Sequence, residues 1–243
     1  MTDADLARHL ATAAGRLLAE LQKDGPADPR ALGRAGDLAS NEYLMAELRR
    51  QRPDDAILSE EEAPDLARLS ARRVWLIDPL DGTREYSERR KDWAVHVALS
   101  INGAIADGAV AQPGLGQCVC TAHPPALPAE ASPLRFLVSR TRPAPMAETL
   151  AAALGGVLVP MGSAGAKTLA LLRGEADVYL HQGEMNEWDS GAPAAVAQAA
   201  GLSVSRLDGS ALRFNQPRPL TPDILICHPQ RRDQLLALVA AHS

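Results

Sequence analysis

From residue 134 onward, short apolar runs typical of strands alternate with amphipathic segments typical of helices. The strand-type runs are LRFLVS, GVLVP, DVYL and DILIC, which begin at residues 134, 156, 177 and 223. The helix-type segments between and after them cover 145–154, 164–173, 189–200 and 229–241. Such alternation is typical of an α/β layer, in which helices cover the faces of a sheet. It therefore restricts the second half of the chain to a layered α/β arrangement.

The first half has a different pattern, with helix-type segments followed by a strand-rich region. Leucines recur at three- and four-residue spacing over 4–21, and 40–50 is typical of a second helix after a Gly/Pro-rich link over 24–37. Farther on, WAVHVALSI and AIADGAV flank Asn102-Gly103, a dipeptide that favours a tight hairpin turn. We therefore expect helices beside a largely antiparallel sheet.

A segment rich in proline and alanine, AHPPALPAEASP at 122–133, separates the two patterns. Its composition is typical of a junction. The sequence thus predicts an α/β protein of two subdomains: an α+β subdomain over 1–130 and an α/β subdomain over 131–243.

Charge and composition exclude several classes of function. The chain has a net charge of −5 and no basic stripe, which argues against a nucleic-acid polymer as partner. No apolar run approaches the roughly 20 residues of a membrane span, and charges interrupt the N-terminal segment, so we expect a cytoplasmic protein. The three cysteines, Cys118, Cys120 and Cys227, favour neither a disulfide framework nor a metal site.

The most informative motif is Asp78-Pro79-Leu80-Asp81-Gly82-Thr83, which follows the apolar run VWLI. Proline lacks an N–H for the strand ladder, so the motif predicts a tight turn on which both aspartates converge. Gly82 permits close backbone approach, and its N–H and that of Thr83 would form an anion site. Two acids on one turn are, taken alone, more often a solvated turn or a helix cap.

Other acids occupy comparable places, where a buried element ends. Glu60 follows the short apolar run AIL, Asp189 opens a helix, and Asp37 precedes one. Two carboxylates ~4 Å apart repel by about 4 kcal/mol at an effective dielectric of ~20. Divalent cations remove that repulsion, and all-oxygen ligands favour Mg²⁺, Mn²⁺ or Ca²⁺ over zinc.

Several longer motifs then resemble the inositol monophosphatase superfamily in order and spacing. They are GD (36–37), SEEE (59–62), WLIDPLDGTREY (75–86), GSAGAK (162–167) and EWDSGAPAAVAQAAG (187–201). DGTREY, EWD and Lys167 are most similar to the CysQ-type 3′(2′),5′-bisphosphate nucleotidases of this superfamily. The resemblance implies a layered αβαβα fold with the active site between two subdomains.

The resemblance also implies roles for particular residues. Two or three Mg²⁺ ions, with Mn²⁺ as a substitute, would be held by Glu60, Asp78, the Leu80 carbonyl, Asp81 and Asp189. Asp37 and Thr83 would act together on the attacking water, and the amides of Gly82 and Thr83 would bind the phosphate. Ser163 and Lys167 are candidate substrate contacts, although Ser163 is equally suited to capping a helix and Lys167 to solvent. His96 is expected as an ordinary strand residue.

The implied activity is hydrolysis of a small phosphorylated metabolite. The first expectation is conversion of 3′-phosphoadenosine 5′-phosphate to AMP and phosphate. This reaction would belong to sulfate assimilation, and lithium would inhibit the enzyme. A phosphatase of inositol phosphate or fructose 1,6-bisphosphate is the alternative, although the loop LHQGEMNE, with Glu184, departs from the inositol enzymes. A metal- or phosphate-binding regulator is the non-enzymatic alternative. Relatives often form homodimers, so a homodimer is an assembly that the resemblance allows.

Overall fold

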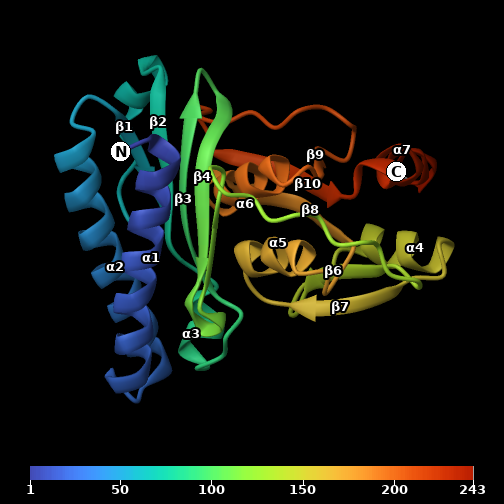
Figure 1. The fold of residues 1–243 in the computed structure, drawn as a ribbon, viewed down its shortest axis with the longest axis horizontal. Coiled ribbons are helices and arrows are strands. Elements are labelled where there is room, and N and C mark those ends of the chain that lie inside the picture. Colours follow the sequence, from blue (N-terminus) through green and yellow to red (C-terminus); the bar gives the residue numbers. More distant parts are fainter. Residues whose placement is uncertain (243) are drawn as a thin grey trace.

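Helices and sheets of this protein alternate in five layers (Figure 1). The computed structural model describes residues 1–242. The outer layer of α1 (Asp3–Asp24) and α2 (Pro29–Gln51) covers the first sheet. α5 (Ala164–Leu172) and α6 (Glu187–Ala199) lie between the two sheets, and α4 (Pro145–Ala153) with α7 (Arg232–His242) covers the far side of the second. The prediction of a layered αβαβα fold is confirmed.

The first sheet has the strand order β1-β2-β3-β4-β5. Its strands are β1 (Ala56–Ser59), β2 (Arg73–Asp81), β3 (Ala94–Ile101), β4 (Ala104–Gln112) and β5 (Gln117–Cys120). All neighbours are antiparallel except β1 and β2, which run parallel. Asn102 and Gly103 both have positive φ, 53° and 76°, which suits the tight turn of the predicted hairpin.

The second sheet has the order β7-β6-β8-β10-β9. Its strands are β6 (Arg135–Ser139), β7 (Val157–Met161), β8 (Val178–Asn186), β9 (Ser203–Ser205) and β10 (Leu220–Cys227). The three strands β7, β6 and β8 are parallel, and β10 is antiparallel to β8 and β9. The short edge strand β9 is absent from the sequence-based prediction because three residues carry no detectable period.

The predicted link over 24–37 is wrong from residue 29 onward, because α2 already begins at Pro29. Asp28 caps this helix through the Ala31 N–H, and proline suits its first position. Gly36 lies where a Cβ would approach Leu80 and Tyr86 to 2.9 Å, so it serves close packing rather than chain flexibility. Consequently Asp37 lies within α2 and does not precede it.

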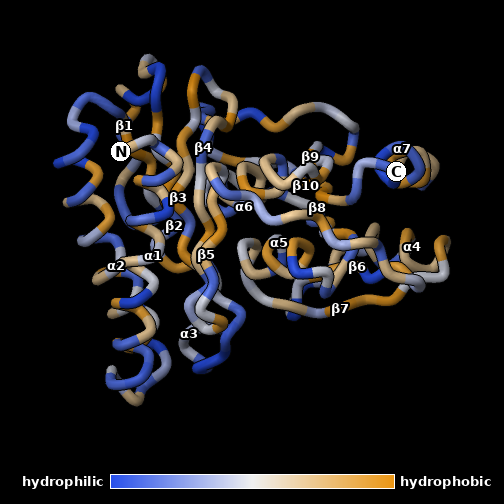
Figure 2. Tube along the Cα trace, viewed as in Figure 1, coloured by the Kyte–Doolittle hydropathy of each residue, from blue (hydrophilic) through white to orange (hydrophobic). Residues whose placement is uncertain are grey.

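α6 contacts strands of both sheets and forms the centre of the molecule. Alanines and glycines on its surface let the backbones approach closely: a Cβ on Gly108 of β4 would lie 2.9 Å from Ala195. Figure 2 shows apolar colouring along the strands of the first sheet and on α5, and hydrophilic colouring in the outer turns of α1 and α2. One apolar core therefore extends from the first sheet through α6 to the second.

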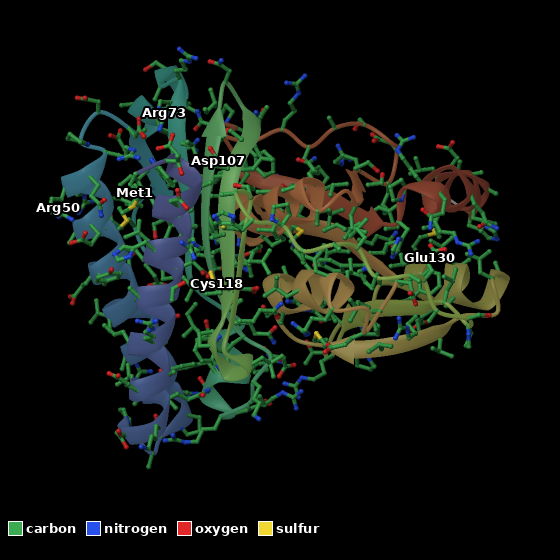
Figure 3. The ribbon with its side chains drawn as sticks, viewed as in Figure 1. Met1, Arg50, Arg73, Asp107, Cys118 and Glu130 are labelled. Atoms are coloured by element: carbon green, nitrogen blue, oxygen red, sulfur yellow. The ribbon has the colours of Figure 1, made fainter. Side chains whose placement is uncertain are left out.

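The segment 122–133 contains no helix or strand, as its composition predicts. It leads from the first sheet to the second, and Figure 3 shows Glu130 on the side of the second sheet, away from Cys118 on β5. Glu130 pairs there with Arg231 at 3.0 Å.

Candidate active site

An irregularity in the first sheet positions the two aspartates of the central motif. The β2–β3 register pairs Asp78 with His96 and Asp81 with Ala94, so the two residues between the aspartates bulge out of the ladder. The bulge is held from both sides. Ser40 on α2 donates its hydroxyl to the Pro79 carbonyl at 2.7 Å, and the Asp78 carboxylate accepts the Leu80 N–H at 3.0 Å. Both carboxylates consequently lie at the same end of β2.

The structure brings four of the predicted ligands together, from three different elements. Glu60 follows β1, Asp78 and Asp81 belong to β2, and Asp189 lies in the first turn of α6, where it accepts the Asn186 N–H at 3.0 Å. We call these four residues the carboxylate cluster. The charge of at least one other member contributes to the pKa shift of Glu60, Asp78 and Asp189, so these carboxylates lie within electrostatic range of one another.

Burial and neighbouring negative charge raise the pKa values of three members of the carboxylate cluster. Burial, then the charges of Glu60, Asp81 and Asp189, raise the pKa of Asp78 well above its usual range. Burial and the charge of Asp81 raise the pKa of Asp189 to about 6, and burial and the charge of Asp189 raise that of Glu60 to about 7. Glu60 is exposed, so water screens its charge and its raised pKa corresponds to less free energy than that of Asp189.

Such a cluster needs protons or cations to be stable. Asp78 lies within hydrogen-bonding reach of both Glu60 and Asp189, which requires shared protons when no cation is bound. Among residues 1–242 no three His, Cys, Asp or Glu side chains are arranged so that they could hold a metal ion as they stand. The all-oxygen chemistry of the four carboxylates fits Mg²⁺ or Mn²⁺. That they hold these ions, with the Leu80 carbonyl, stays a prediction.

Asp81 differs from the other three because donors surround it. Its Oδ2 accepts the hydroxyl of Ser163, accepts the Gly165 N–H at 2.8 Å, and lies 3.0 Å from His96 Nε2. Burial opposes ionisation, but the charge and contacts of His96 outweigh it, so the pKa of Asp81 is lowered. Ser163 also caps α5 by accepting the Ala166 N–H at 2.9 Å.

His96 is the functional candidate that sequence reasoning missed. It belongs to β3, is fully buried, and carries polar contacts on both ring nitrogens. Its place in an alternating apolar strand gives no sign of this. The contact with Asp81 appears only in the folded structure, where the pairing of β2 with β3 brings His96 to the end of β2 that carries both aspartates.

Thr83 and Asp37 meet as predicted. The Thr83 hydroxyl lies 3.3 Å from Asp37 Oδ1 and 3.1 Å from the Leu80 carbonyl. Burial and the neighbouring charge of Glu61 raise the pKa of Asp37 to about 6. α2 and the short helix α3 (Thr83–Ser87) thus present a hydroxyl–carboxyl pair beside the Leu80 carbonyl.

A cavity of about 280 Å³ opens beside these groups. We call it the Lys167 cavity; its lining includes Gly82, Thr83, Arg84, Arg142, Ser163 and Lys167. Lys167 is 6% exposed, its ammonium lies over the Tyr179 ring at 5.1 Å, and burial lowers its pKa. A carbonyl, that of Gly162 at 3.5 Å, is its nearest hydrogen-bond acceptor among the described residues. The cavity therefore offers positive charge to an anion.

Arg140 and Glu184 already have ion-pair partners. Arg140 pairs with Glu85 and Glu88, at 2.9 and 2.8 Å, so its guanidinium is already neutralised. Glu184 lies on β8, is exposed, and pairs with Arg218 at 2.9 Å.

The layered fold with acids gathered where β1, β2 and α6 meet is the fold of inositol monophosphatase-like proteins. Inositol monophosphatase-II from Staphylococcus aureus superposes with a TM-score of 0.80 at 18% identity, over 97% of this chain and 95% of that one. CysQ from Bacteroides thetaiotaomicron superposes with a TM-score of 0.79 at 25% identity, over 93% and 97%.

The chain belongs to the inositol monophosphatase family, whose model matches residues 5–243. It is 47% identical to the 3′-phosphoadenosine 5′-phosphate phosphatase of Mycobacterium leprae, over 98% of this chain and 94% of that protein. It is 31% identical to the 3′(2′),5′-bisphosphate nucleotidase CysQ of Escherichia coli, over 74% of this chain and 78% of that protein. The predicted family and the class of phosphoric monoester hydrolase are confirmed, and enzymes of this family generally depend on metal ions. Among residues 1–242 no helix is long and apolar enough to cross a membrane.

Proposed function

We propose that this protein removes the 3′-phosphate of 3′-phosphoadenosine 5′-phosphate, with Mg²⁺ as cofactor. The observation that carries the proposal is the convergence of the carboxylate cluster, from β1, β2 and α6, beside a cavity with a buried lysine. The 47% identity with a phosphatase of that name supports the choice of substrate.

The cluster supplies the oxygen ligands. Glu60, Asp78, Asp81, Asp189 and the Leu80 carbonyl hold two to three Mg²⁺ ions, for which Mn²⁺ can substitute. When bound, these ions neutralise the phosphoryl oxygens and stabilise the leaving oxygen. The chain's own part is to keep four carboxylates and one carbonyl close together despite the repulsion between the carboxylates, and the bulge of β2 and the first turn of α6 do this.

Thr83 and Asp37 orient the attacking water. Thr83 accepts a hydrogen bond from the water or relays its proton, and Asp37 polarises the Thr83 hydroxyl across 3.3 Å. A carboxyl whose pKa is about 6 exchanges protons near neutral pH, which suits such a relay.

The Lys167 cavity receives the substrate. The amides of Gly82 and Thr83 bind the scissile phosphate, and Lys167 and Ser163, which line the same cavity, contact the substrate. An ammonium buried in this way attracts a phosphate strongly because little water screens it. A substrate with two phosphates can use both the cluster and the lysine.

The test is phosphate release from three substrates side by side, with and without Mg²⁺. The expected result is a higher kcat/KM for 3′-phosphoadenosine 5′-phosphate than for inositol 1-phosphate or fructose 1,6-bisphosphate, and no release with a chelator. Asp189→Asn should abolish turnover, and the exposed Glu184→Gln should not. Turnover that survives chelation refutes the metal site, a preference for the inositol or sugar phosphate refutes the substrate, and absence of any release favours a regulator.

We also propose that the enzyme works in the cytoplasm, that residues 1–130 and 131–243 form two subdomains around the site, and that the assembly is a homodimer. The three free cysteines fit a reducing compartment. The placement of most proposed ligands in the first subdomain and of Asp189, Ser163 and Lys167 in the second supports the division. Sedimentation of the purified chain tests the homodimer.

A further inference from the structure

His96 joins the two sides of the proposed site. Its Nε2 lies 3.0 Å from Asp81 Oδ2, and its Nδ1 lies 3.1 Å from the carbonyl oxygen of Trp188. Trp188 directly precedes Asp189 in α6. One fully buried ring therefore contacts a β2 member of the carboxylate cluster and the residue next to its α6 member.

The chemistry of these contacts fixes the orientation of the ring. A carbonyl oxygen can only accept, so Nδ1 carries a hydrogen and donates it to Trp188. Nε2 then faces the carboxylate of Asp81. Its N–H does not point along the line to Oδ2, so the contact is an attraction between charges rather than a linear hydrogen bond.

The surrounding packing leaves the ring no alternative position. A Cβ on Gly165 would lie 2.2 Å from His96 Nε2, so the first turn of α5 rests directly on the ring. That same turn gives the Ser163 hydroxyl and the Gly165 N–H to Asp81 Oδ2. Three contacts from β3 and α5 thus occupy one oxygen of Asp81, and none of them occupies Oδ1.

We propose that His96 is a positioning residue for the metal site: together with Ser163 and Gly165 it holds Asp81 Oδ2 and leaves Oδ1 as the oxygen offered to the ions. This inference rests on the proposed function, since it assumes that the cluster binds divalent cations. It also gives Ser163 a role in holding the carboxylate of Asp81, in addition to any contact with substrate.

The test is Mn²⁺ binding to the purified full-length chain, measured by electron paramagnetic resonance of the free ion, without substrate. His96→Asn retains a donor near the Nδ1 position but cannot reach Asp81, whereas His96→Gln places its amide nitrogen near the Nε2 position. Loss of such an outer contact typically lowers metal affinity about 10- to 100-fold. We expect that loss in His96→Asn, with the Mg²⁺ requirement of turnover shifted in parallel, and most of the affinity restored in His96→Gln.

Ser100→Ala is the matched control. Ser100 is buried on the same strand, and its hydroxyl has no hydrogen-bond partner among the described residues, so its removal should leave Mn²⁺ affinity unchanged. If His96→Asn does not fold, as judged by circular dichroism, Ser163→Ala carries the test, because it removes another contact to Asp81 Oδ2. It should lower Mn²⁺ affinity more than it raises the KM for substrate.

The outcomes separate the two proposals. An unaltered chain that binds no Mn²⁺ refutes the metal site and the inference with it. An unaltered chain that binds Mn²⁺, with the same affinity in His96→Asn, refutes only the positioning role. Equal losses of Mn²⁺ affinity in His96→Asn and His96→Gln also refute the positioning role, because a donor restored near the Nε2 position would then make no difference.

Discussion

Removal of divalent cations should make the stability of this protein fall steeply as the pH rises. The reason lies in Asp189, whose pKa is raised from 3.8 to about 6, chiefly by burial and then by the charge of Asp81. A raised carboxyl pKa means that the folded state binds the proton more tightly than the unfolded state. The folded state therefore loses free energy relative to the unfolded one as the pH climbs through that interval.

The size of the effect follows from the shift. A difference of about 2 pKa units corresponds to ~3 kcal/mol. About half of it, ~1.4 kcal/mol, is lost between about pH 5 and about pH 8, because part of the interval from 3.8 to about 6 lies below pH 5. In a protein of this length each kcal/mol moves the melting temperature by about 2–4 °C, which gives a fall of about 3–6 °C. Asp78 adds to it in the same direction, and so does His96, whose raised pKa makes its favourable contact disappear as pH rises. Glu60 adds less, because water screens it.

The assay is thermal unfolding followed by circular dichroism at about pH 5 and about pH 8, with a chelator or with excess Mg²⁺. Mg²⁺ at 100 times its dissociation constant contributes ~2.7 kcal/mol, more than the fall that Asp189 causes. Asp189→Asn should flatten the pH dependence of the chelated protein, and Glu184→Gln should not. A chelated, unaltered protein that melts no lower at about pH 8 than at about pH 5 would show that the cluster carries no excess charge.

Other changes have separate outcomes. Asp81→Asn should abolish turnover in excess Mg²⁺ while circular dichroism shows an intact fold; activity near that of the unaltered protein would exclude Asp81 as a ligand. Thr83→Ala should reduce kcat by about 100-fold or more with Mn²⁺ affinity nearly unchanged, as for loss of a group that moves a proton. Gly165→Ala should lower Mn²⁺ affinity, because the added methyl displaces His96. Asp177→Ala should cost about 3 kcal/mol in urea unfolding, since its buried carboxylate binds the Arg135 guanidinium and two backbone N–H groups.

The sequence alone predicted the fold, and the carboxylates that it proposed as ligands lie close together, for identifiable reasons. The alternation of strand and helix patterns after residue 134 reflects how each element buries one face, so it survives in the sequence. Asp78, Asp81 and Asp189 were predictable because each lies where a regular element starts or ends, and such ends leave recognisable residues, notably Pro79 and Gly82.

The prediction was wrong where packing overrides local preference. Gly33 and Gly36 suggest a link, yet α2 runs through both, since tertiary contacts with Thr83, Leu80 and Tyr86 need the missing side chains. The partners of His96 lie on β2 and α6, far away in the sequence. No local pattern specifies such long-range contacts, so they required the three-dimensional structure.

The position of α6 between the sheets has a consequence for the two halves of the chain as separate fragments. Its flanks are covered by strands from both halves of the chain, and it delivers one acid to a group whose other acids come from the opposite half. On the proposed chemistry, neither half by itself would contain all the metal ligands, and each would leave part of the shared apolar core exposed to solvent. Either half produced by itself should therefore lack phosphatase activity, and the two halves should need each other to fold.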